Sequence, residues 1–476
     1  MTSSALFTDL YELTMAQGYF RYEMNSRVVF DMFFRRQPFG GGFSVFAGLE
    51  DLITALEGFR FRSDDLEYLE SLGIFADDFL RYLEDFRFSG DIYAVPEGTV
   101  VFPHEPLIRV HGSQIETQLI ESMLLNIVNF QTLIATKTAR IYLASNRGRI
   151  MEFGLRRAQG PDGAMSASRA AFIGGASSTS NSLAGKTYGI PVSGTMAHSW
   201  VMSFDSEEEA FARYAELYPE TTTLLIDTYN TMKSGVPHAI TVGKTLQARG
   251  LPFGVRLDSG DMQYLSFQVR DALDRAGLRD AKIAVSNELD EEIVASLVSS
   301  GCPIDFWGVG THLVTGGKDP SLTGVYKLAA REKNGEFIPT MKVSDNPEKS
   351  TNPGIKQVYR FYDEKGGPLA DLIAFEGSGF PPGEPVLFHH PLMDYRNFTL
   401  RSFGKALPLL EKRMEGGKII GPRPALTELR QRAMREIAGL DPTYTRILNP
   451  HVYKVSISEA LRKAKVAIIS EFLERH

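Results

Sequence analysis

Short apolar runs alternate with helix-like segments between about residues 148 and 315. Alternation of this kind predicts βα units and a parallel sheet. Seven runs have the length and composition of strands: RIMEFG (149–154), AAFIGG (170–175), IPVSGT (190–195), TTLLIDT (222–228), PFGVRLD (252–258), KIAVSNE (282–288) and DFWGVGT (305–311). Because a regular barrel of the TIM type has eight strands, these seven predict an irregular α/β barrel.

The ends of these runs are polar or rich in glycine. The residues at or just after the ends read RR, SS, AHS, DTYN, DSGD, SNE and GVGTH. The active site of a parallel barrel lies at the carboxyl ends of its strands, where the loops that follow the strands meet. We therefore expect the functional residues of this chain at these positions.

The two ends of the chain have a different pattern. The runs VVFDMFFR, DIYAVPEGTVVF and PLIRV precede the predicted barrel, and VYKLAAR, FIPTMKV and KQVYRFYD follow it. They are typical of antiparallel strands. The sequence therefore predicts an α/β fold in which a smaller α+β domain is built from residues 1–115 and 325–476, the latter with terminal helices. A helical connection at 116–148 leads into the barrel at 149–324.

Composition narrows the class of protein. The 476 residues are 43% hydrophobic and 23% charged, which is typical of a folded globular protein. The formal net charge of −7 gives no general attraction to nucleic acid or to an acidic membrane, so an anionic ligand needs a local cationic cluster. The single cysteine, Cys302, cannot form an intramolecular disulfide, and no apolar run is long enough for a membrane helix. Because the N-terminus also lacks a secretory pattern, we expect a cytoplasmic protein.

The motif GTMAHS places His198 and Ser199 directly after an apolar run. A neutral imidazole at a strand end can act as a nucleophile or as a base. The alternative is a histidine that only satisfies hydrogen bonds. Its place within a series of polar strand ends favours the functional interpretation.

The motif GVRLDSGD contains a cation and a carboxylate two positions apart, Arg256 and Asp258. Side chains two positions apart lie on the same face of an extended strand. Arg256 can bind a phosphate there, and Asp258 can accept hydrogen bonds from sugar hydroxyls or help to hold a metal ion. The alternative is a salt bridge within the barrel.

Two further strand ends carry groups that bind anions. In GVGTHLVTGG, Gly308 and Gly310 permit close backbone approach and Thr311 follows the strand, so this turn can present amides to a phosphate. In FGLRR, either Arg156 or Arg157 can pair with a carboxylate or a phosphate. Zinc-ligand spacing, a P-loop and the dinucleotide fingerprint are all absent from the sequence. The residues present fit transfer chemistry on a phosphorylated, anionic sugar.

Ten segments resemble the motifs of nicotinate phosphoribosyltransferases, in the order in which that family has them. They are TDLYELTMAQGY, FGGGFSVFAGLED, LLNIVNFQTLIATKTAR, EFGLRRAQGPDG, GTMAHSWV, LIDTYNT, GVRLDSGD, SNELDE, VGTHLVTG and NPGIKQVYR. The resemblance implies a type II phosphoribosyltransferase fold and a homodimer with shared active sites. It also implies an ATP-coupled, Mg²⁺-dependent reaction in the salvage of NAD. In that reaction nicotinate, phosphoribosyl pyrophosphate, ATP and water give nicotinate mononucleotide, pyrophosphate, ADP and phosphate.

The resemblance further assigns roles to single residues. His198 matches the histidine that ATP phosphorylates, and Arg256 and Asp258 match catalytic positions. The residues that match the nicotinate site are the partner's Tyr11, and Phe153, Leu155, Arg156, Asn181 and Ser199. Those that match the phosphoribosyl pyrophosphate site are Arg157, Arg256, Asp258, Glu288, Gly308, Gly310 and Thr311. Asp258 and Asp227 are the candidate ligands of Mg²⁺.

Several other functions remain as alternatives. A nicotinamide phosphoribosyltransferase would share the fold and the histidine. The amide-specific enzymes that this chain resembles have an aspartate near the position of Asn181, and an aspartate would repel the carboxylate of nicotinate. Asn181 would not repel it, which favours nicotinate as the substrate. A quinolinate-specific enzyme requires a denser basic pocket. A barrel aldolase or isomerase requires a lysine or an acid–base pair at a strand end, and Lys233 and Lys318 lie outside the predicted strands. A non-catalytic metabolite-binding barrel requires no histidine nucleophile.

Overall fold

The computed structural model describes residues 4–344, 349–393 and 395–475. The chain forms two compact units. We call Ile134–Pro320 the barrel unit, and Met1–Leu133 together with Ser321–His476 the end unit. An architecture of two units, one of them built from both chain ends, is what the sequence predicts. The size of the end unit needs correction, because it holds the larger part of the chain.

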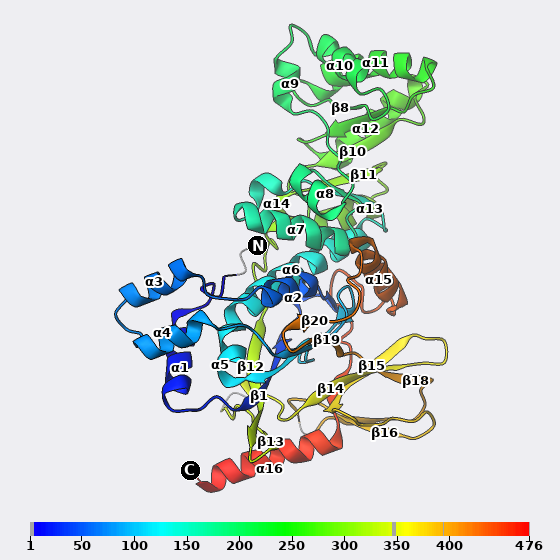
Figure 1. The fold of residues 1–476 in the computed structure, drawn as a ribbon. Helices are drawn as coiled ribbons and strands as arrows, with labels where there is room; N and C mark the ends of the chain where they lie inside the picture. The colour runs from blue at the N-terminus through cyan, green and yellow to red at the C-terminus, as the bar shows by residue number, and fades with distance from the viewer. Residues whose placement is uncertain (1–3, 345–348, 394, 476) are drawn as a thin grey trace. The chain divides into compact units, whose positions relative to one another are not determined.

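The barrel unit is built on a six-stranded sheet in the described part of the chain (Figure 1), and every strand pair in it is parallel. The order of the strands is β7 (Ser178–Thr179), β6 (Arg149–Glu152), β11 (Phe306–Val309), β10 (Lys282–Ser286), β9 (Gly254–Leu257) and β8 (Thr223–Leu225). Over the described residues β7 and β8 are the outer strands and do not pair with each other, so the barrel is irregular, as predicted.

Five of the seven predicted runs contain strands of this sheet, and two do not. The prediction for AAFIGG is wrong, because residues 170–173 form the last turn of helix α7 (Gly160–Ile173). Every residue from Ser166 to Ile173 is buried, so this end of the helix has no exposed face, and its apolar pattern cannot be distinguished from that of a buried strand. IPVSGT forms only a short parallel pairing, in which Pro191 O accepts from Thr179 N–H at 3.0 Å. Proline has no N–H group to extend such a ladder.

Helices connect the strands of the barrel unit. Side-chain caps define where several of them begin: Ser206, Asp261 and Asp290 each accept a hydrogen bond from a backbone N–H in the first turn. The helices after α7 are α8 (Ser182–Tyr188), α9 (His198–Met202), α10 (Glu207–Leu217), α11 (Val236–Ala248), α12 (Met262–Arg275), α13 (Glu291–Ser299) and α14 (Thr311–Val314). Because each connection returns the chain to the start of a parallel strand, the carboxyl ends gather at one edge.

The end unit contains two larger sheets and one short pair among its described residues. The seven-stranded sheet is antiparallel, in the order β13 (Glu336–Pro339), β12 (Gly324–Lys333), β1 (Arg27–Phe34), β5 (Ile108–Ser113), β3 (Asp91–Ala94), β19 (Glu411–Glu415) and β20 (Lys418–Ile419). The six-stranded sheet has the order β17 (Asn397–Leu400), β16 (Val386–His389), β21 (Val455–Ile457), β15 (Pro368–Phe375), β14 (Lys356–Tyr362) and β18 (Lys405–Pro408). The short pair is β2 (Ser44–Val45) and β4 (Val100–Val101).

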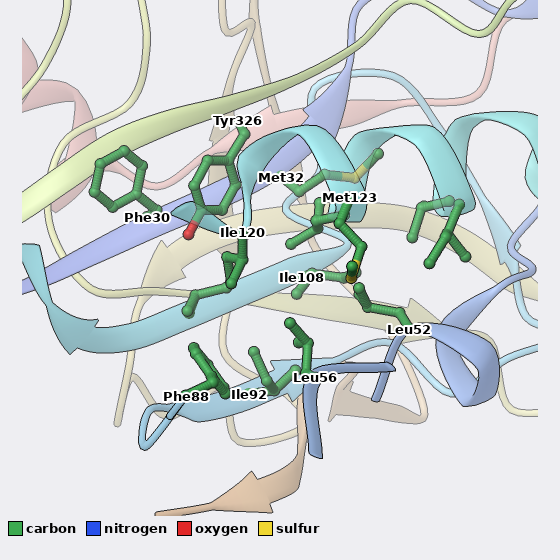
Figure 2. Packing of buried hydrophobic residues seen from close by; sticks show 14 of the residues in the cluster. Phe30, Met32, Leu52, Leu56, Phe88, Ile92, Ile108, Ile120, Met123 and Tyr326 are labelled. Atoms are coloured by element: carbon green, nitrogen blue, oxygen red, sulfur yellow. The ribbon is translucent and has the colours of Figure 1, made fainter. Parts of the chain in front are cut away.

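Helices of the end unit cover the seven-stranded sheet and enclose its main core. They are α1 (Leu10–Arg21), α2 (Leu49–Glu57), α3 (Ser63–Ser71), α4 (Asp77–Glu84) and α5 (Gln114–Leu119), with the first part of α6 (Glu121–Ala144). Helix α16 (Glu459–Arg475) packs instead on β15 and β16 of the six-stranded sheet, and α15 (Leu426–Gly439) packs beside β4. Figure 2 shows Met32 and Ile108 of the sheet close to Leu52 of α2 and Met123 of α6. Burial of these side chains supplies the main stabilising free energy of this unit.

A buried ion pair joins two strands of the six-stranded sheet. The guanidinium of Arg360 donates to both carboxylate oxygens of Asp371, at 2.7–3.1 Å, and to Val100 O at 2.9 Å. Arg360 is 1% exposed and Asp371 is 0% exposed. Burial raises the pKa of the neighbouring Glu105 carboxyl well above its usual range, and Asp371 adds to this shift. Arg360 therefore balances a carboxylate that has no access to water.

No helix among the described residues combines the length and the apolar character that crossing a membrane requires.

We predict that Arg360→Met destabilises the end unit by roughly 3–5 kcal/mol, because Asp371 would remain buried without its cation. Urea unfolding followed by circular dichroism should show a lower midpoint. The control is Arg21→Met, which removes an exposed ion pair with Asp78 and should change stability by at most about 1 kcal/mol. Equal midpoints for the two variants would contradict the assigned role of Arg360.

Candidate active site

A pocket of about 340 Å³ lies at the carboxyl ends of β6, β9, β10 and β11. Ten residues that the sequence predicts for the site line it: Phe153, Leu155, Arg156, Arg157, Arg256, Asp258, Glu288, Gly308, Gly310 and Thr311. Seven further residues complete the lining: Ser180, Gly194, Thr195, Met196, Ala197, Ser286 and Asn287. The strand-end rule therefore brings most of the predicted residues together.

Three guanidinium groups face this pocket. Arg156 and Arg157 lie on the short 3₁₀ turn Leu155–Arg157 after β6, and neither guanidinium has a hydrogen-bond or ion-pair partner in the described part of the chain. The Arg256 guanidinium on β9 donates to Thr195 Oγ1, but its Nε atom is buried without a partner among the described residues. Unpaired buried donors are rare in folded proteins, so this group is poised for a ligand.

Burial lowers the pKa of the Arg256 guanidinium from its ordinary value. The carboxylates of Asp258 and Asp227 oppose this shift, whereas the positive charge of Arg156 adds to it. Arginine nevertheless keeps its charge near neutral pH. The two like charges repel each other in the empty pocket, and an anion between them removes that repulsion.

Asp258 is held at the end of β9 by a neutral donor. Its Oδ1 atom accepts a hydrogen bond from the Ser286 hydroxyl. Its Oδ2 atom lies 3.8 Å from His198 Nε2, which is too long for a hydrogen bond, and accepts from no other described residue. One oxygen of this carboxylate is therefore free for a hydroxyl or a cation.

Asp227 does not line the pocket but holds the turn that carries Asp258. Its Oδ2 atom accepts from the backbone N–H of Asp258 at 2.9 Å and from the Ser259 hydroxyl at 2.6 Å. Asp227 is 8% exposed. Asp227 thereby fixes the turn that presents Asp258, and its Oδ1 atom is buried without a partner among the described residues.

His198 begins helix α9 beside the pocket. Its Nδ1 atom lies 3.1 Å from the Thr228 hydroxyl, and its Nε2 atom faces Asp258. Ser199, the next residue, is exposed and does not line the pocket. If Nδ1 donates to Thr228, then Nε2 carries the lone pair of the neutral ring.

Asn181, which the sequence predicts to contact nicotinate, is buried and lies outside the pocket lining. Its side-chain oxygen accepts from Ala184 N–H at 3.1 Å and caps helix α8. Its side-chain nitrogen donates to the Ser168 hydroxyl at 3.2 Å. Both polar atoms are committed to the fold, so any effect of Asn181 on ligand choice must pass through its neighbour Ser180, which lines the pocket.

Gly308 and Gly310 let the backbone of β11 lie close to Phe153. A Cβ atom on Gly308 would come within 2.8 Å of the Phe153 ring, and a Cβ atom on Gly310 would lie 3.2 Å from Phe153 O. The aromatic ring therefore packs over a bare strand, where any side chain would displace it. This contact sets the shape of one wall.

The turn after β10 has an unusual backbone. Asn287 and Glu288 have φ values of 84° and 36°, in the left-handed region that non-glycine residues avoid. Glu288 also pairs with His312 Nε2 at 3.1 Å. Strained residues of this kind gather at functional sites, and both of these line the pocket.

Tyr11 belongs to the end unit, on helix α1, and its side chain is 49% exposed. Burial of part of the ring raises the pKa of the phenol, and the carboxylates of Glu121 and Glu12 raise it further. The hydroxyl therefore stays protonated and can donate a hydrogen bond.

Four polar residues escaped the sequence analysis: Thr195, which binds Arg256; Thr228, which binds His198; Ser286, which binds Asp258; and Ser180. Three of them lie within the predicted runs, and Ser180 follows β7. Their position at or near strand ends was the one signal that could have identified them. Serine and threonine are too common in sequences for the residue type alone to mark a site residue.

The described residues contain no group of three or more His, Cys, Asp or Glu side chains that could hold a metal ion by themselves. A metal here would depend on oxygen atoms of a bound phosphate, as Mg²⁺ commonly does. Three cations around one free carboxylate oxygen and a histidine make a pocket for a ligand with several negative charges.

Three family models match the chain in succession. They are the nicotinate phosphoribosyltransferase (NAPRTase) N-terminal domain over residues 6–129, the nicotinate phosphoribosyltransferase (NAPRTase) family over residues 149–358, and the nicotinate phosphoribosyltransferase C-terminal domain over residues 355–465. The second of these contains every residue of the pocket lining.

Curated relatives and solved structures agree with the family models. A nicotinate phosphoribosyltransferase of Bacillus subtilis is 42% identical over 475 residues, which is 99% of this chain and 96% of the relative. One from Mycobacterium tuberculosis is 45% identical over 383 residues, 80% of this chain and 81% of the relative. The crystal structure of the human nicotinic acid phosphoribosyltransferase covers 97% of this chain and 99% of its own, at 32% identity and a TM-score of 0.85. A Pyrococcus furiosus nicotinate-nucleotide pyrophosphorylase shares the fold, at 23% identity and a TM-score of 0.70 over 91% of this chain and 94% of its own.

We predict that Gly308→Ala weakens the binding of inorganic pyrophosphate, a compact polyanion, by about tenfold, because the new methyl group pushes the Phe153 ring into the pocket. Titration calorimetry measures this affinity directly. The matched control is Gly163→Ala in helix α7, where a Cβ atom meets nothing within 4 Å. Unchanged affinity in Gly308→Ala would show that the glycine has no role in shaping the pocket.

Proposed function

The chain belongs to the nicotinate phosphoribosyltransferase family, and we propose that it carries out its reaction in the pocket of the barrel unit, with ATP as a co-substrate. Transfer of a phosphoribosyl group to nicotinate, in the salvage of NAD, is the activity of the family. The proposed reaction consumes nicotinate, phosphoribosyl pyrophosphate, ATP and water. It releases nicotinate mononucleotide, pyrophosphate, ADP and phosphate.

The convergence of three guanidinium groups on one pocket carries this proposal. Arg156 and Arg157 have no carboxylate partner among the described residues, and Arg256 keeps a buried donor unpaired. Phosphoribosyl pyrophosphate and nicotinate together bring a phosphate, a pyrophosphate and a carboxylate. Charge-assisted, bidentate hydrogen bonds from arginine fit each of these groups.

Nicotinate is proposed to lie against Phe153, with its carboxylate on Arg156. Phe153 lies on the strand-end segment that leads into the turn of Arg156, so one short stretch of chain supplies both contacts. The partner's Tyr11 is proposed to close the ring from the other side in a homodimer. A neutral amide would leave the Arg156 charge unpaired, which favours the acid over nicotinamide.

Phosphoribosyl pyrophosphate is proposed to lie along Arg256, Asp258, Glu288 and the glycine turn Gly308–Thr311. The pyridine nitrogen attacks the anomeric carbon, and the bond from that carbon to pyrophosphate breaks. Positive charge grows on the ribose during this step. The carboxylate of Asp258 stabilises that charge, while Arg157 and Arg256 stabilise the departing pyrophosphate.

His198 is proposed to accept the γ-phosphoryl group of ATP on Nε2. Thr228 occupies Nδ1 at 3.1 Å, so the other nitrogen is available as nucleophile. A P–N bond forms, the bond between the γ-phosphorus and the bridging oxygen of ADP breaks, and water later releases phosphate. A phosphoryl group on Nε2 would stand close to Asp258 and change the charge beside the substrate.

Mg²⁺ fits the free Oδ2 atom of Asp258, and together with substrate phosphates it would neutralise charge on the leaving pyrophosphate. Asp227 is proposed to fix the turn of Asp258, and its unpartnered Oδ1 atom makes it the second candidate ligand of Mg²⁺. Cytoplasm is the proposed compartment, since the one cysteine, Cys302, forms no intramolecular disulfide.

We predict that Arg156→Ala weakens nicotinate binding by roughly 2–5 kcal/mol and phosphoribosyl pyrophosphate binding much less, because only nicotinate would lose its charge partner. Separate calorimetric titrations of the two substrates measure this difference. Arg249→Ala, at an exposed position outside the pocket lining, is the control and should bind both substrates normally. Equal losses for the two substrates would count against a specific contact with nicotinate.

We predict that His198→Ala abolishes substrate-dependent ATP hydrolysis, because the variant loses the imidazole whose Nε2 atom faces Asp258. Phosphoribosyl transfer should persist at a reduced rate, since Arg256 and Asp258 remain. Incubation with γ-labelled ATP should leave acid-labile, base-stable phosphate on the wild-type protein and none on the variant. The exposed His451 of the end unit serves as control through His451→Ala. Label that persists in His198→Ala would exclude this residue as the nucleophile.

A further inference from the structure

Glu152 ends strand β6, directly before Phe153, and its carboxylate is almost completely buried at 1% exposure. It accepts three hydrogen bonds, from Gly154 N–H, from the Ser168 hydroxyl at 2.9 Å and from the Thr179 hydroxyl at 2.5 Å. All three donors are neutral. A buried carboxylate is expensive for the fold unless its acceptors are satisfied, and here three donors satisfy it.

The three donors come from three different elements around the pocket. Gly154 begins the turn that carries Arg156, Thr179 lies on β7 directly before Ser180, and Ser168 lies on α7. Phe153 and Arg156 on one side and Ser180 on the other all line the pocket. One side chain thus connects the two pocket segments that flank the proposed place of nicotinate.

Further hydrogen bonds make this connection rigid. The Ser180 N–H donates to Glu152 O at 2.9 Å, and the Phe153 N–H donates to Val309 O at 2.8 Å. Asn181 joins the same cluster, since its backbone N–H donates to the Thr179 hydroxyl at 3.0 Å and its side chain to Ser168. Gly154 has no space for a side chain, because a Cβ atom there would lie 2.1 Å from Val314 Cγ1.

A purely structural role does not require a carboxylate here. An apolar side chain of similar volume, packed between α7 and β7, generally stabilises a fold as well as a buried charge does. A carboxylate differs in its geometry, because its two oxygens hold one backbone N–H and two hydroxyl groups at fixed directions. Precise placement of the groups above it is what this arrangement supplies.

We propose that Glu152 is a positioning residue for nicotinate, which holds Phe153 and Arg156 in register with Ser180. The inference rests on the proposed location of nicotinate in the pocket. It assigns to Glu152 no contact with substrate: the carboxylate acts only through the turn of Gly154 and through Thr179. Errors of about 1 Å in such placements can lower rates by up to roughly a hundredfold.

The test is Glu152→Gln, which keeps the volume but offers one acceptor oxygen where the carboxylate offers two. The calorimetric Kd and the KM of nicotinate should both rise about tenfold, while those of phosphoribosyl pyrophosphate change by less than about threefold. Thr179→Val removes one donor with little change of shape, and should raise the nicotinate values about threefold. It also keeps the test decisive if Glu152→Gln fails to fold.

The control is Glu291→Gln in the same unit. Glu291 is equally buried and binds Lys137 and Arg140, but it lies outside the pocket lining. This variant should lower the thermal midpoint and leave the ratio of the two Kd values unchanged. If Glu152→Gln behaves in the same way, Glu152 is structural and the proposal is overturned. The calorimetric Kd values test the role of Glu152 independently of turnover. Failure of the proposed function would appear differently, as wild-type protein that shows no ATP-stimulated turnover.

Discussion

Parallel strands β6, β9, β10 and β11 end at the same edge of their sheet, and this constraint brings like charges together in one pocket. Arg256 is half-buried there, near Arg156 and with its Nε donor unpaired among the described residues. The carboxylates of Asp258 and Asp227 offset part of the repulsion between these cations. The binding of polyanionic substrates relieves the repulsion, which links the fold of the barrel unit directly to its choice of ligand.

The way in which the carboxylates of the site are held leaves the positive charge of the arginines available to a substrate. Asp258 is held by the Ser286 hydroxyl, Asp227 by Ser259 and a backbone amide, and Glu152 by a backbone amide and two hydroxyls. Because neutral donors hold each of these carboxylates, none of them forms an ion pair with an arginine of the pocket. The guanidinium groups therefore remain free for substrate, and the carboxylates stay where positive charge develops on the ribose or where they support the lining from behind.

The sequence predicted much of this arrangement, because period and position carry the information about strand ends. It placed β6, β8, β9, β10 and β11, and ten residues of the lining. It failed at AAFIGG, where a buried helix end has the composition of a strand. Strand-end position also cannot give the direction of a side chain. It did not predict the hydrogen bonds that Asn181 makes to Ser168 and Ala184, or those by which Asp227 holds the turn of Asp258.

The central claim is that this pocket joins an acidic pyridine to phosphoribosyl pyrophosphate with the help of ATP. Mononucleotide formation measured side by side with nicotinate, nicotinamide and quinolinate, each with and without ATP, tests it most directly. The account predicts product from nicotinate, a higher rate with ATP, and little product from the other two. A preference for nicotinamide or quinolinate, or a rate with nicotinate that ATP does not change, would contradict it.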